Sequence, residues 1–80
     1  SNRLDAYFKE IYKNRVLCEA HAITMDQYRQ SIEDTLEDLI QAPISGQEFV
    51  KSLRDMTKYH LIDQQQVSRC SQRYRQIKNI

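Results

Sequence analysis

A pattern of apolar and polar positions recurs three times along the chain. It consists of an isoleucine, a Thr, Ser or Asp, two variable residues, a Glu or Gln, and a further apolar residue. At the start of a helix, the Thr, Ser or Asp side chain accepts a hydrogen bond from a backbone N–H that has no intrahelical partner. The Glu or Gln bonds back to this capping residue, and the two apolar residues pack on each other. The pattern occupies residues 23–28, 44–49 and 62–67, and it predicts helices that begin at Met25, Gly46 and Gln64.

Apolar residues spaced three and four positions apart predict amphipathic helices over residues 3–21, 25–41, 46–59 and 64–78. Pro43 ends the second of them, because the residue before a proline disfavours the helical conformation. In the last helix the apolar positions form a narrow stripe, which is typical of a helix that packs against another helix. This apolar stripe consists of Val67, Cys70, Tyr74 and Ile77.

These patterns predict an all-α fold, a compact bundle of about four short amphipathic helices arranged as two helical hairpins. A single glycine and a single proline leave little material for the turns of a β-sheet. We expect one small domain, residues 1–80, with a core shallow enough to gain from a partner chain. Because Ser1 takes the place of an initiating Met, we expect either an excised domain of a longer protein or a processed product.

The composition limits the cellular setting. No apolar run approaches the roughly 20 residues that a membrane-spanning helix needs, and no export signal follows the first residues. The two cysteines, Cys18 and Cys70, belong to no C-x-x-C pair and are too few for a disulfide scaffold. We therefore expect a soluble, intracellular protein of the cytoplasm that does not bind membranes.

Charge is distributed unevenly, although the net charge is only +1. Residues 24–42 carry five acidic residues and one basic residue, whereas residues 63–80 carry four basic residues and one acidic residue. Glu33 and Glu37 are like charges one helical turn apart, an unfavourable arrangement that calls for nearby cations. Two interpretations follow: basic residues of neighbouring helices relieve the acidic face, or this face is a docking surface for a basic partner.

The basic last helix raises a second possibility, nucleic-acid binding. Arg and Gln side chains read base edges in the major groove, and residues 48–63 are suited to the first helix and turn of a helix-turn-helix. However, Arg69 and Arg75 fall opposite the apolar stripe, while Arg73 and Lys78 flank it, so the charge forms no single reading edge. The turn also lacks the usual glycine. Nucleic-acid binding therefore remains the alternative function.

Catalysis finds little support in the residue types. The chain has two histidines, no glycine-rich phosphate loop and no recognisable nucleophile with its base. A zinc site would need Cys18, His21, His60 and Cys70 together, but their spacing matches no familiar zinc motif. We expect packed cysteines and histidines at helix ends, and we predict no enzyme, no cofactor, no metal site and no small-molecule substrate.

The function that remains is a non-catalytic helical protein–protein interaction or regulatory module. It is predicted to present the basic last helix or the acidic second helix to a protein partner or to a second copy of the chain in a dimer. The predicted partner-binding residues are Arg69, Arg73, Tyr74, Arg75 and Lys78 in the last helix and Glu33, Glu37 and Asp38 in the second.

Overall fold

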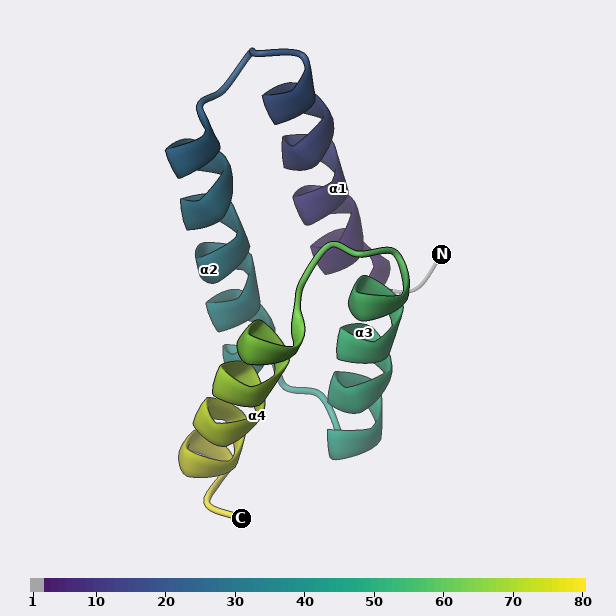
Figure 1. Ribbon diagram of the computed structural model, residues 1–80. Helices are drawn as coiled ribbons and strands as arrows, with labels where there is room; N and C mark the ends of the chain where they lie inside the picture. Colours follow the sequence, from purple (N-terminus) through teal and green to yellow (C-terminus); the bar gives the residue numbers. More distant parts are fainter. Residues whose placement is uncertain (1–2) are drawn as a thin grey trace.

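The computed structural model describes residues 3–80 and contains four α-helices in this part of the chain, with no strand. The helices are α1 (Asp5–Glu19), α2 (Met25–Gln41), α3 (Gly46–Lys58) and α4 (Gln64–Lys78), as Figure 1 shows. The all-α prediction is confirmed, and α2, α3 and α4 begin at the predicted residues.

A complete capping box starts each of these three helices. At the start of α2, Thr24 Oγ1 accepts a hydrogen bond from the Gln27 N–H at 3.0 Å, and Gln27 Oε1 accepts one from the Thr24 N–H at 2.8 Å. The equivalent pairs satisfy the first turns of the other two helices in the same way. They are Ser45 with Glu48 at α3 and Asp63 with Gln66 at α4.

The helices α1 and α3 end in the same way. His21 and His60 adopt left-handed backbone conformations, with φ of 61° and 60°. The Ala22 N–H then bonds to the Leu17 carbonyl at 2.8 Å, and the Leu61 N–H bonds to the Met56 carbonyl at 2.9 Å. This is the Schellman arrangement, which satisfies the last carbonyls of a helix. Because of it, α1 and α3 end one or two residues earlier than the apolar pattern predicted.

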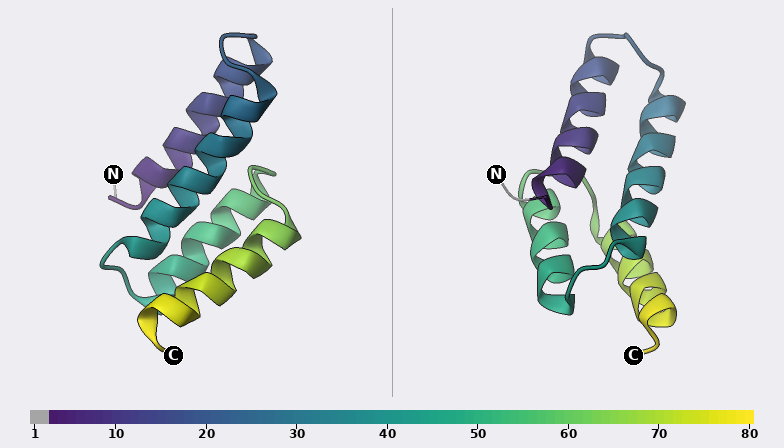
Figure 2. Two further views of the ribbon diagram at one scale, coloured as in Figure 1. Left: turned by 90° about the vertical axis from the view of Figure 1, so that its left-hand side faces the viewer. Right: turned by 180° about the vertical axis from the view of Figure 1, so that it is seen from behind.

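The helices form two hairpins, α1 with α2 and α3 with α4 (Figure 2). Between the hairpins, α1 packs against α3 and α2 packs against α4. The loop between α1 and α2 lies beyond the ends of α3 and α4 in all views (Figures 1 and 2). One apolar core joins the four helices, and it contains Ile11, Ile32, Leu36, Leu39, Ile40, Phe49, Leu53, Met56, Leu61, Ile62, Cys70 and Tyr74.

The far end of the first hairpin lies outside this core. From Tyr12 to Ser31 no residue is buried, and the side chains of Val16 and Met25 are about half exposed. The second hairpin reaches this part only at its edge, where Arg15 donates a hydrogen bond to the Tyr59 carbonyl at 3.2 Å and Gln66 lies near Arg29, so no third layer covers it. The core therefore occupies the end of the molecule where all four helices meet.

Candidate functional site

The acidic and basic side chains that were predicted to bind a partner contact one another within the chain. Arg73 donates two hydrogen bonds of 3.0 Å to the carboxylate of Glu37, and Arg69 donates one of 3.2 Å to Glu33. The hydrogen bonds from Arg73, together with one from Gln41, lower the pKa of Glu37 from 4.5 to about 2. The same contact raises the pKa of Arg73. The basic residues of α4 thus relieve the acidic face of α2.

The apolar stripe of α4 is also used inside the fold. Tyr74 is only 6 % exposed, and its ring stacks on Phe49 with ring centroids 4.0 Å apart. Its hydroxyl donates to the Ile44 carbonyl at 3.4 Å. Lys78 lies over the Tyr74 ring and donates a hydrogen bond of 3.1 Å to the Ala42 carbonyl. Tyr74 and Lys78 therefore fasten α4 to α3 and to the loop before it.

Two of the predicted residues remain at the surface without such contacts. Arg75 and Asp38 are both exposed, and within residues 3–80 neither side chain forms an ion pair. They lie on different helices, so they define no common site.

Both cysteines lie within helices, and both histidines lie just after the end of a helix. Cys70 is buried, and burial, followed by the nearby charges of Glu33 and Glu37, raises its pKa to about 12. Cys18 is half-buried in the far part of the first hairpin. The histidines terminate α1 and α3. Among the residues that the structure describes, no group of three or more His, Cys, Asp or Glu side chains is placed to hold a metal ion.

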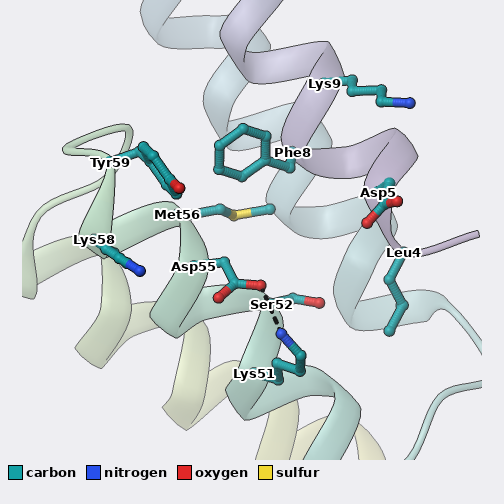
Figure 3. Close-up of a pocket in the computed structure, with 10 residues that line it drawn as sticks. All are labelled: Leu4, Asp5, Phe8, Lys9, Lys51, Ser52, Asp55, Met56, Lys58 and Tyr59. Atoms are coloured by element: carbon teal, nitrogen blue, oxygen red, sulfur yellow. Dashed lines mark hydrogen bonds and ion pairs between the residues drawn. The ribbon is translucent and has the colours of Figure 1, made fainter. Parts of the chain in front are cut away.

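A groove of about 310 Å³ lies between the first half of α1 and the second half of α3 (Figure 3). We call it the α1–α3 groove. Phe8 of α1 and Leu4, which precedes that helix, line one side, and the buried side chain of Met56 lines the groove from α3. It is lined by Leu4, Asp5, Phe8, Lys9, Lys51, Ser52, Asp55, Met56, Lys58 and Tyr59.

Two aromatic residues, Phe8 and Tyr59, line this groove, and a third, Tyr12, lies beside Phe8 outside the lining. The ring of Phe8 meets the Tyr59 ring edge-on, with centroids 5.4 Å apart, and lies nearly parallel to the Tyr12 ring at 6.4 Å. Tyr12 and Tyr59 are 52 % and 55 % exposed. Half-exposed tyrosines beside an apolar floor are typical of interfaces, because such a ring offers a large contact area together with a polar hydroxyl.

Charged side chains surround the apolar floor. Lys51 and Asp55 pair across one turn of α3 at 3.0 Å, which is the dashed contact in Figure 3. Lys58 lies 5.7 Å from the centre of the Tyr59 ring, and Lys9 extends from α1 on the other side of Phe8 (Figure 3). The groove therefore combines an apolar floor with ammonium groups on both of its walls.

Sequence reasoning did not predict this groove. The sequence predicted helices over residues 3–21 and 46–59, but it did not indicate that these two helices lie side by side. The pattern of apolar residues in one helix does not indicate which other helix lies beside it.

Comparison with known proteins gives no relative: no family model matches the chain, and no curated protein or solved structure matches it either. No helix within residues 3–80 is both long enough and apolar enough to cross a membrane.

Proposed function

We propose that this protein is a non-catalytic helical module that binds another protein through the α1–α3 groove. One observation carries the proposal: the half-exposed Tyr59 meets the Phe8 ring edge-on in a groove that the buried Met56 also lines, and the half-exposed Tyr12 lies beside Phe8. Aromatic residues near an apolar depression are the usual energetic anchors of protein interfaces.

The internal ion pairs make the charged faces of α2 and α4 less suitable than the groove as a binding surface. Glu33 and Glu37 already have partners in Arg69 and Arg73, so a binding protein would have to displace these contacts. It would gain little in return, because ion pairs exposed to solvent contribute little to stability or affinity. In contrast, Tyr12 and Tyr59 are about half exposed, so a partner can cover them.

The size of the groove favours a protein partner over a small molecule. Ligand pockets usually enclose roughly 300–1,000 Å³, so a volume of about 310 Å³ is at the lower limit. This volume accommodates anchoring side chains of a partner and leaves little room for a cofactor. The polar groups in the groove form no catalytic pair, because the Asp55 carboxylate is bound to Lys51.

The helix-turn-helix alternative receives less support from the geometry. α3 and α4 run side by side in opposite directions (Figure 2) and contact each other through Phe49 and Tyr74, whereas the helices of a helix-turn-helix cross at about 90–120°. Two of the four basic side chains of α4, Arg69 and Arg73, are paired with carboxylates. A phosphate backbone would compete with these pairs.

Selection from a displayed library of short helical peptides tests the proposed function. We expect the wild-type protein to enrich binders whose affinity falls by about tenfold or more in Tyr59→Ala, since aromatic anchors often contribute about 2 kcal/mol or more. Val50→Ala is the matched control, because Val50 is 51 % exposed on α3, the helix that Tyr59 follows, and does not line the groove. Absence of any enriched binder, or equal loss in both variants, contradicts the proposal.

A further inference from the structure

We infer that the α1–α3 groove takes an acidic amphipathic helix, whose apolar residues contact Phe8 and Met56 and whose carboxylates lie beside Lys9 and Lys58. This inference rests on the proposed function and specifies the chemistry of the partner at the same site.

The shape of the floor favours a helix as the occupant. Leu4, the residue before α1, and Phe8 are four positions apart, and Ser52 and Met56 are one turn apart on α3. Side chains that line a groove once per helical turn are complementary to a row of side chains at positions i and i+4 on a third helix. Tyr59 would close one end of the contact, as its ring is in edge-to-face contact with Phe8.

The charges on the rim favour an acidic partner. Of the five charged side chains that line the groove, Lys51 and Asp55 already pair at 3.0 Å. Asp5 lies in the first turn of α1, where the helix N-terminus favours a carboxylate. The ammonium groups of Lys9 and Lys58 form no ion pair within residues 3–80.

The positions of these two lysines require negative charge on two sides of the partner. Lys9 extends from α1 and Lys58 from α3, on opposite sides of Phe8 and Met56 (Figure 3). A helix with an apolar ridge and acidic residues on each flank would place a carboxylate beside each lysine. The acidic excess of α2 does not oppose this arrangement, because no residue of α2 lines the groove.

A pair of synthetic helices provides the test, with binding followed by backbone amide shifts in NMR titrations. Both helices have about 16 residues, a length at which a designed helix forms in water, with the same Leu and Phe ridge. One carries Glu on both flanks, and the other carries Lys at the same positions. We expect the Glu helix to shift amides around Phe8, Ser52, Met56 and Tyr59 and to bind at least about fivefold more tightly than the Lys helix.

Reversing the charge of two lysines on the protein provides the second part of the test. In Lys9→Glu/Lys58→Glu, affinity for the Glu helix should fall by about tenfold and affinity for the Lys helix should rise. Arg54→Glu is the control, since Arg54 is exposed on α3 and does not line the groove. Urea melts of all variants confirm that each is folded, and both charge-reversed residues are exposed.

The outcomes separate this inference from the proposed function. Equal affinity for the two helices, with shifts at the groove, overturns the inference about charge and leaves the groove as a docking surface. Shifts centred on α4 overturn the inference by placing the acidic helix on the basic helix instead. If neither helix binds and the peptide library also yields no binder, both proposals fail.

Discussion

Arg73 donates one hydrogen bond to each carboxylate oxygen of Glu37, from Nε to Oε1 and from Nη2 to Oε2, and both measure 3.0 Å. Two-pronged contacts of this kind are among the stronger side-chain pairs, because the planar guanidinium matches the carboxylate. One turn away on both helices, Arg69 donates a single hydrogen bond of 3.2 Å to Glu33. Together these pairs join the second hairpin to the first.

We predict that Glu37→Gln destabilises the fold at pH 7 and has less effect as the pH falls. The folded-state pKa of Glu37 is about 2, below its ordinary value of 4.5. A lowered pKa means that the ionised pair stabilises the fold fully above about pH 4.5, and that this contribution is lost as the pH falls towards 2. Urea melts of the wild type and Glu37→Gln at several pH values measure the difference. A difference that stays constant from pH 7 to pH 2 would exclude the ion pair as its source.

The capping residues give a prediction about local structure. Ser45→Ala and Asp63→Ala should each lower the free energy of unfolding by about 1 kcal/mol, because each leaves an N–H in the first turn without its acceptor. Asp63→Asn is the matched control, since its side-chain oxygen still accepts a bond from the Gln66 N–H. Chemical denaturation measures all three variants. If the Ala variants unfold at the same urea concentration as the wild type, the caps contribute no stability.

Local features of this fold could be predicted from the sequence because they depend on residues close together in the chain. The capping boxes at Thr24, Ser45 and Asp63 need only a polar residue and a Glu or Gln three positions later, so three helix starts were predicted correctly. The ends of α1 and α3 were predicted one or two residues too late, because the left-handed conformations of His21 and His60 have no strong sequence signal. A glycine at either position would have been such a signal, because glycine commonly occupies this left-handed position after a helix.

Features that depend on which helices are neighbours could be predicted only in part. The sequence offered two interpretations of Glu33 and Glu37, and the structure places arginines of α4 against both. Tyr74 was predicted to bind a partner, whereas in the fold it stacks on Phe49. The α1–α3 groove depends on the contact of two helices that are not adjacent in the chain, and helical periodicity does not determine such contacts.

Replacing a histidine by glycine at a helix end should stabilise the protein. His60 has φ of 60°, a conformation that costs a residue with a side chain about 1–2 kcal/mol, whereas the extra flexibility of glycine in the unfolded chain costs about 0.5–1 kcal/mol. We therefore expect His60→Gly to raise the free energy of unfolding by about 0.5–1 kcal/mol. His60→Ala is the control, because alanine keeps the strain. A Gly variant no more stable than the Ala variant would show that the left-handed conformation is not the source of strain, and a loss of stability in both variants would show that the imidazole itself stabilises this turn.

The two cysteines should differ sharply in reactivity. Burial raises the pKa of Cys70 to about 12, so its thiol stays protonated at pH 8 and is shielded from reagents, whereas Cys18 is only half-buried. We expect a thiol reagent such as dithionitrobenzoate to modify Cys18 in the folded protein and to modify Cys70 only when the protein unfolds. Cys18→Ser isolates the reaction of Cys70, and guanidinium chloride should restore it. Rapid modification of Cys70 in the native Cys18→Ser protein would mean that α4 separates readily from α2, and the ion pairs of Glu33 and Glu37 would then be too weak to hold the hairpins together.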